Sequence, residues 1–192
     1  MFSILNSPTD MNEQIPTSSP PWVWVGFVFA FAFFVIEILW VALDLEERGI
    51  NLILRLIVFG GSIYWLVCIH RIHKILAQLT RNRYPITPGQ SAGYHFIPFY
   101  NLYWLFKWPS ELSDYLNYRG RVKMIPGGLI GALLLLALLL RLLDGSFGLL
   151  CTFGVTMYVS AKLKQHVKSL RGITPDQLPP LPDPAIFSRP QT

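Results

Sequence analysis

Long apolar runs constrain the fold of this sequence more than any other feature. They cover residues 22–43, 50–69, 124–143 and 147–163. A helix needs about 20 mostly apolar residues to cross a bilayer, so the first three runs are long enough, and the fourth can continue into the membrane interface. Because only a helix satisfies its own backbone in lipid, each run should be helical. The pattern predicts an all-α integral membrane protein with four transmembrane helices in two hairpins.

Composition agrees with one membrane domain. Hydrophobic residues make up 52% of the 192 positions, and the mean hydropathy is +0.41, which is high for a soluble domain. We assign residues 22–168 to this domain. Residues 1–21 are polar and should be a mobile cytoplasmic N-terminus, and the proline-rich residues 169–192 should be an extended cytoplasmic tail. Whether that tail docks to a partner stays open.

Basic residues predict the orientation. They cluster between the second and third runs and after the fourth, whereas the two short connections hold only Arg48 and Arg141. Positive residues stay in the cytoplasm, so both termini should be cytoplasmic and both hairpin turns outside. The net charge of +5 therefore reflects topology and attraction to membrane lipid. It does not indicate nucleic-acid binding.

Two charges lie inside the first predicted hairpin. Glu37 and Arg55 fall at the same depth, roughly 9 Å from the outer edge at 1.5 Å per residue. Intramembrane charges are costly and usually paired or functional. We therefore expect an intramembrane ion pair that locks the two helices together, and keep a proton or ion relay as the alternative.

The sequence holds no recognisable catalytic, cofactor or metal motif, and we expect no enzymatic activity, cofactor or bound metal. His70 and His73 have helical spacing, but a third ligand is not evident, so they are interpreted as interfacial polar residues. Cys68 and Cys151 are expected to be small buried thiols. Gly127 and Gly131 form a small-residue helix face that predicts a close contact, either within the bundle or between copies as a homo-oligomer or with a protein partner.

The stretch GYHFIPFYNLYWLFKWPSEL, Gly93 to Leu112, is aromatic but too short to span. Trp108 precedes a proline and is disfavoured in a helix. We therefore predict two short helices, Phe99–Lys107 and Pro109–Asn117, joined by a bend. The whole element, residues 93–117, should be re-entrant or interfacial. Its candidate binding residues are Tyr94, His95, Tyr100, Asn101, Tyr103, Trp104, Lys107, Trp108 and Glu111.

A short sequence recurs after the second and fourth runs. Residues 86–90 read ITPGQ and residues 173–177 read ITPDQ, 87 positions apart. Each follows a basic amphipathic segment. The recurrence is explained either by duplication of a hairpin unit or by a shared device that ends a helix.

The region from Ile69 to Leu112 resembles uncharacterised bacterial multi-pass membrane proteins of the domain-of-unknown-function type. The matching positions are Pro88, Ala92, Phe96, Pro98, Asn101, Leu102, Trp104, Glu111 and Leu112. The resemblance implies a bacterial inner-membrane location and no particular activity. From these features we expect a non-enzymatic membrane component that binds a lipid, a hydrophobic ligand or a partner protein at its cytoplasmic face. A small transporter or channel subunit is the alternative.

Overall fold

The computed structural model describes residues 19–43, 50–80, 84, 86–118 and 122–170. The described part of the chain is all-helical and contains no strand, which confirms the predicted all-α class. Its elements are α1 (Val23–Ala42), α2 (Ile50–Leu79), α3 (Pro88–Gly93), the 3₁₀ helix η2 (Tyr94–Phe96), α4 (Pro98–Tyr118), α5 (Gly127–Leu143) and α6 (Gly145–Leu170). The predictions for residues 1–18 and for the proline-rich tail from residue 171 onward lie outside the described residues.

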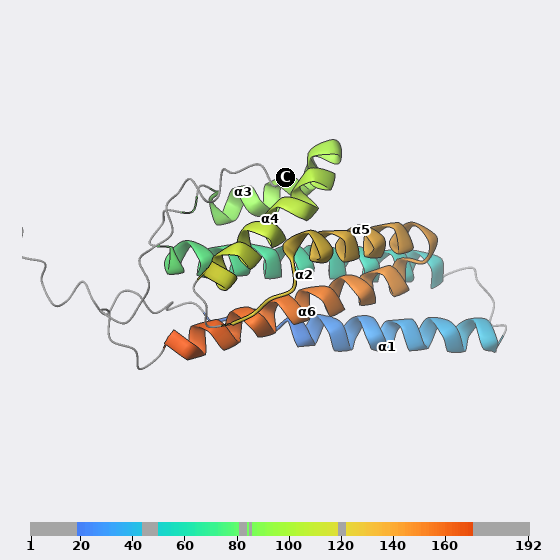
Figure 1. Ribbon diagram of the computed structural model, residues 1–192. Coiled ribbons are helices and arrows are strands. Elements are labelled where there is room, and N and C mark those ends of the chain that lie inside the picture. Colours follow the sequence, from blue (N-terminus) through green and yellow to red (C-terminus); the bar gives the residue numbers. More distant parts are fainter. Residues whose placement is uncertain (1–18, 44–49, 81–83, 85, 119–121, 171–192) are drawn as a thin grey trace, which may run out of the picture.

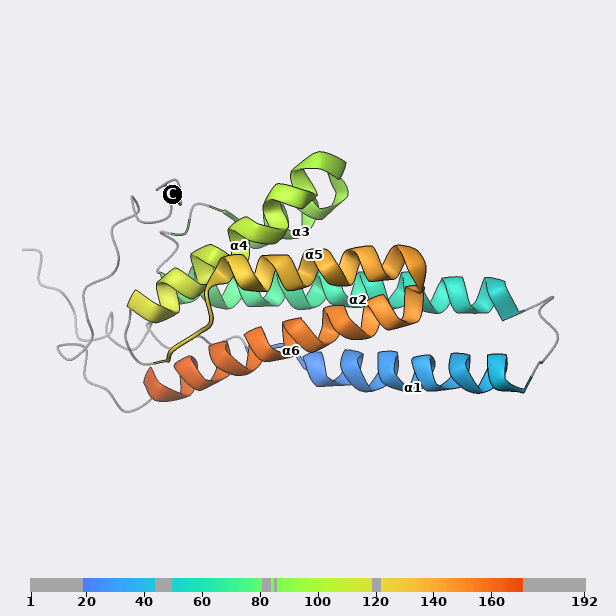
Figure 2. The same ribbon diagram turned by 45° about the vertical axis from the view of Figure 1, so that its right-hand side comes forward.

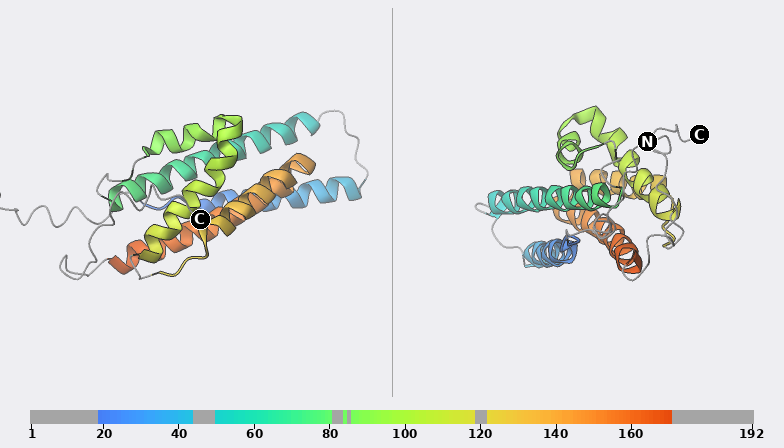
Figure 3. Two further views of the ribbon diagram at one scale, coloured as in Figure 1. Left: turned by 45° about the horizontal axis from the view of Figure 1, so that its top comes forward. Right: turned by 90° about the vertical axis from the view of Figure 1, so that its left-hand side faces the viewer.

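Four long helices, α1, α2, α5 and α6, form a bundle as two antiparallel hairpins (Figure 1). The C-terminal ends of α1 and α5 and the N-terminal ends of α2 and α6 lie at the same end of the bundle, on the right of the view. We call this the turn end. The end-on view in Figure 3 shows α3 and the start of α4 on one side of the long helices, away from α1.

Within the described part of the chain, three helical segments are long and apolar enough to cross a membrane: α1, residues Ile53–Leu79 of α2, and α6. The fourth long helix, α5, is apolar over a shorter length of 17 residues. Most large side chains of α1 are exposed, including Trp24, Phe31 and Ile36. A contiguous apolar surface of this extent needs lipid or protein to cover it, and the three apolar helices are compatible with a membrane location.

The predicted helix positions are close to those observed, but two helices are longer than their apolar runs. α2 continues for ten residues beyond Ile69, and α6 continues to Leu170. Both extensions are amphipathic. Their buried side chains, such as Ile72, Leu76 and Val167, pack into the bundle. Burial against other helices therefore stabilises these extensions beyond the apolar runs.

The prediction of two separate helices, Phe99–Lys107 and Pro109–Asn117, is wrong, because α4 is a continuous helix that includes Pro109. A proline inside a helix costs about 3 kcal/mol through its missing N–H and its ring. Trp108, Leu112 and Leu116 are buried on the same helix. Packing of this buried face against α2 and α5 outweighs the local preference.

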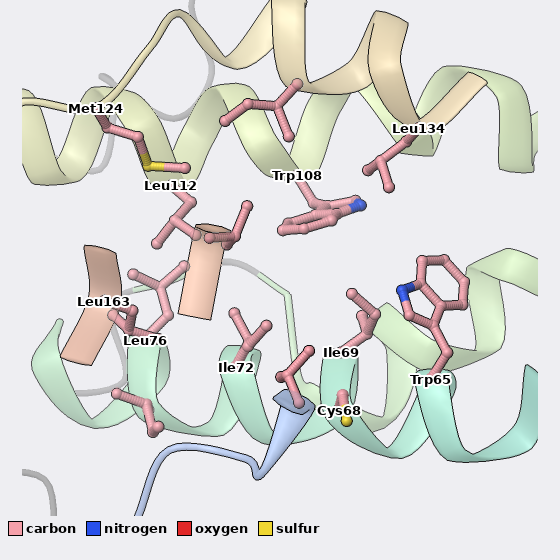
Figure 4. Close-up of a cluster of buried hydrophobic side chains, with 14 of the residues drawn as sticks. Trp65, Cys68, Ile69, Ile72, Leu76, Trp108, Leu112, Met124, Leu134 and Leu163 are labelled. Atoms are coloured by element: carbon pink, nitrogen blue, oxygen red, sulfur yellow. The ribbon is translucent and has the colours of Figure 1, made fainter. Parts of the chain in front are cut away.

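The core lies where α4 packs over α2, α5 and α6. Figure 4 shows Trp108 and Leu112 of α4 pointing toward Ile69 and Ile72 of α2. These side chains belong to one buried hydrophobic cluster that also contains Leu163 of α6. The core therefore ties the segment between the two hairpins to both of them.

Candidate functional site

The segment from Pro88 to Tyr118 folds back on itself as a helical hairpin, α3–η2–α4, which we call the inserted hairpin. Its N-terminal arm begins at a capping box. The Thr87 hydroxyl accepts a hydrogen bond from the Gln90 backbone N–H, and the Gln90 side chain accepts one from the Thr87 N–H. With Pro88 in the first turn, these residues start a helix efficiently. The ITPGQ sequence therefore begins a helix here rather than ending one.

Hydrogen bonds hold the inserted hairpin along α2. Near its base, the Tyr115 hydroxyl donates to the Leu79 carbonyl at 3.2 Å. Further along, a ring nitrogen of His70 lies 3.0 Å from the carbonyl oxygen of Pro88. Within the hairpin, the Trp104 indole N–H donates to the carbonyl of Ser91 at 3.0 Å and joins the two arms.

The tip of the inserted hairpin reaches Trp65. The His95 ring packs edge-on against the Trp65 indole with centroids 4.8 Å apart. His95 Nδ1 lies 2.8 Å from Asn101 Oδ1, which fixes the turn between η2 and α4. Burial lowers the pKa of His95 to about 4, so it is neutral at pH 7. Since Leu79 and Trp65 are 14 residues apart, the tip lies about 21 Å along α2 from the base.

A buried polar group fastens α4 beneath this tip. The Tyr84 hydroxyl donates to Glu111 Oε2 at 2.6 Å, and Lys107 Nζ lies 3.4 Å from Glu111 Oε1. Burial raises the pKa of Glu111, and burial beside that carboxyl group raises the pKa of Tyr84 well above its usual range. The ring of His73 contacts those of Trp104 and Trp108. The arrangement locks α4 to α2.

The opposite face of the inserted hairpin is apolar and exposed. Figure 2 shows its turn standing away from the long helices. Phe99 is 87% exposed, and the other exposed side chains on this face are Phe96, Ile97, Leu102 and Tyr103. Such a patch requires an apolar environment.

The nine candidate binding residues therefore do not form one surface. Only Tyr103 is exposed, and Tyr94, His95, Tyr100, Asn101 and Lys107 are half-buried. Trp104, Trp108 and Glu111 are buried against the bundle, so they do not contribute to the exposed surface of the hairpin. Phe96 and Phe99 were missed as exposed residues, although they lie on either side of Pro98, where the chain turns from η2 into α4.

Glu37 and Arg55 line the same cavity, but they form no salt bridge with each other in the structure. The cavity has a volume of ≈ 630 Å³ and lies between α1, α2, the end of α5 and the start of α6. We call it the turn-end cavity. Glu37 Oε2 is buried there without a hydrogen-bond partner among the described residues. The ion pair stays a prediction.

Arg141 was not predicted to act with the first hairpin, yet it bridges α5 to α2. Its Nη2 donates to the hydroxyl of Ser62 and to the carbonyl of Val58. Arg141 and Ser62 also line a second cavity of ≈ 160 Å³ that extends to His95 and Asn101. Only long-range packing brings these residues together, so no local sequence signal marks them.

Gly127 and Gly131 make their close contact within the bundle. A Cβ at Gly127 would collide with the backbone of Ser110, and one at Gly131 would lie 2.6 Å from the Phe106 ring. The two glycines therefore let α4 approach α5, and this face is already occupied by the same chain. The first of the two predicted alternatives applies, and a second copy or partner protein would need a different surface.

The histidines and cysteines do not form a metal-binding group in the described structure. His70 interacts with the Pro88 carbonyl and His73 with the Ile69 carbonyl. Within the described ranges, no group of three His, Cys, Asp or Glu residues could hold a metal ion. Cys68 and Cys151 are free thiols, the first buried and the second half-buried.

Comparison of the chain with protein-family models, with curated proteins and with solved structures yields no match.

Proposed function

We propose that this chain is a bacterial inner-membrane protein with four spans, α1, α2, α5 and α6, and with both termini in the cytoplasm. Three of these helices have the length and composition of a span, and α5, with 17 residues, is at the short end of the range for one. The basic residues on both sides of the inserted hairpin, such as Lys74 and Lys123, favour a cytoplasmic base.

The inserted hairpin is then a re-entrant element. Its base lies beside Leu79 at the cytoplasmic end of α2, and its tip lies beside Trp65. A helical hairpin that enters only halfway keeps its backbone satisfied by its own helices and by contact with protein. The exposed Phe99 would meet acyl chains at this depth.

The function supported best is that of a non-enzymatic membrane component that binds a lipid, a hydrophobic ligand or a partner protein at its cytoplasmic face. The observation that carries this proposal is the two-sided inserted hairpin. One face is locked to the bundle through Tyr84 and Glu111, and the other presents apolar side chains around Phe99. Of the three ligand classes, lipid suits the exposed face best because its side chains are uniformly aliphatic or aromatic.

Spin labels at Phe99→Cys and Tyr118→Cys test this proposal in reconstituted protein without Cys68 and Cys151. Tyr118 is exposed at the end of α4, three residues beyond Tyr115, which contacts Leu79 at the base of the hairpin. The label at position 99 should be accessible to oxygen dissolved in lipid and shielded from a water-soluble nickel reagent. The label at position 118 should show the reverse. Equal nickel access at both positions would contradict a membrane-inserted tip.

A small transporter or channel subunit is the second candidate. The observation in its favour is that the two cavities share Ser62 and Arg141. Together they place polar groups from Glu37 to Asn101 along the bundle. Flux of protons or small ions into proteoliposomes that depends on Arg141 would favour this function over binding alone.

A further inference from the structure

The turn-end cavity combines charges of both signs with an apolar wall. Its charged lining consists of Glu37 from α1, Arg55 from α2, and Arg141 and Asp144 from the α5–α6 hairpin. Among the described residues, two groups of each sign give a formal sum of zero. A ligand without net charge but with separated charges matches such a lining, because each of its ends meets an opposite charge.

The negative side of the cavity requires a hydrogen-bond donor. Glu37 Oε2 is buried and has no hydrogen-bond partner among the described residues, and a buried carboxylate oxygen in that state is costly. Asp144 does not share this need, because its Oδ1 caps α6 by accepting from the backbone N–H groups of Ser146 and Phe147. Glu37 is therefore the carboxylate available to a ligand.

The positive side presents two guanidinium groups. Arg141 is anchored through Nη2, to Ser62 and Val58, and it lines the cavity. Arg55 is exposed on the neighbouring face of α2. Guanidinium groups bind phosphate oxygens in a fork geometry, so a phosphate suits this side of the cavity.

The remaining wall of the cavity is apolar, which indicates a ligand from the lipid phase. Phe33, Leu54, Phe59 and Leu142 line the cavity, and Phe59 and Leu142 are 64% and 78% exposed. The cavity thus opens through apolar side chains onto the surface that faces lipid. We infer that it binds the headgroup of a phospholipid whose phosphate contacts Arg55 and Arg141 and whose primary ammonium donates to Glu37.

Other headgroups fit this chemistry less well. A choline headgroup has no N–H to donate to Glu37. A phosphatidylglycerol headgroup has a net negative charge that Glu37 repels, although its hydroxyls can donate. The inference rests on the proposed membrane location but concerns a surface remote from the inserted hairpin, so the two can fail separately.

Native mass spectrometry of the full chain, released from nanodiscs of equal parts phosphatidylethanolamine, phosphatidylcholine and phosphatidylglycerol, tests the inference. We expect phosphatidylethanolamine to be retained about tenfold over each competitor, the equivalent of about 1.4 kcal/mol. Glu37→Gln should lose the preference over phosphatidylglycerol, and Arg55→Gln should reduce retention of all three lipids. Arg71→Gln, an exposed arginine on α2 that does not line the cavity, is the matched control and should behave as the unmodified chain.

The outcomes separate the alternatives. Retention of phosphatidylglycerol over phosphatidylethanolamine by the unmodified chain, or an unchanged preference in Glu37→Gln, would overturn the inference. Full displacement of the retained lipid by free phosphoethanolamine would overturn the inference that the ligand is a lipid. The ligand would then be a soluble zwitterion. If Phe99→Ser alters the preference while Glu37→Gln does not, retained lipid belongs to the inserted hairpin and the cavity is excluded as its site.

Discussion

His95 and Trp65 stand edge to face, 4.8 Å apart between ring centroids, although 30 residues separate them in sequence. This contact places the turn between η2 and α4 beside the middle of the membrane-length part of α2. In the proposed topology, a segment too short to span reaches the depth of a span without crossing it.

Gly127→Ala should destabilise the protein by about 1–3 kcal/mol, as overpacking of a tight contact does. The new Cβ would meet the backbone of Ser110, which no side-chain rotation can move aside. Gly128→Ala is the matched control, because a Cβ there meets nothing within 4 Å, and it should be neutral or up to about 1 kcal/mol stabilising. Thermal unfolding in detergent measures the stability of both variants. Equal stability changes would show that α4 does not pack closely against Gly127.

Tyr84→Phe should cost about 1–3 kcal/mol, since it removes the hydroxyl that donates to the buried Glu111 carboxylate. Tyr118→Phe, at an exposed tyrosine on the same helix as Glu111, should change stability by less than about 0.5 kcal/mol. Proteolysis of the folded protein should also speed up near the inserted hairpin in Tyr84→Phe alone. Equal stability of the two variants would mean that the bond does not fasten α4.

Acid should weaken the tip contact. The pKa of His95 is about 4 in the fold against an ordinary 6.5. A depressed folded pKa gives stability that is complete above pH 6.5 and is lost as the pH falls from 6.5 toward 4. The loss should amount to about 1–3 kcal/mol for this half-buried group.

The matched variant for this pH dependence is His95→Gln, which cannot titrate. Unfolding of both proteins followed between pH 7.5 and 4 isolates His95 from His70, His73 and His166, because these are common to both. The stability difference between the proteins should narrow as the pH falls. A difference that stays constant across this range would contradict the assignment.

The four long helices were predicted from sequence because each is defined by a local property, an apolar run of membrane length. The inserted hairpin was predicted only in part. Its short length and two prolines located it, but the rule that a residue before proline leaves the helix failed at Trp108, where burial against α2 decides the conformation. The Thr87–Gln90 capping box was readable in ITPGQ, yet recurrence of the pentapeptide suggested a helix end.

The polar contacts were the least predictable part. The sequence predicted one depth for Glu37 and Arg55, because helix rise per residue determines depth. Both residues line the same cavity. Arg141 binds α2 across the bundle, and Tyr84 binds Glu111 over 27 residues. Such pairs depend on how helices rotate and pack, which a single sequence does not reveal.

The central claim is that the inserted hairpin enters the membrane and returns to the side it came from. The most direct measurement labels single cysteines at Arg83, Lys123 and Leu143 with a membrane-impermeant maleimide, in a chain lacking Cys68 and Cys151. Arg83 precedes the hairpin in the sequence and Lys123 follows it, and Leu143 is exposed at the turn end. The account predicts labelling of position 143 in intact cells, and of positions 83 and 123 only after permeabilisation. Labelling of position 123 but not position 83 in intact cells would mean that the hairpin crosses the membrane.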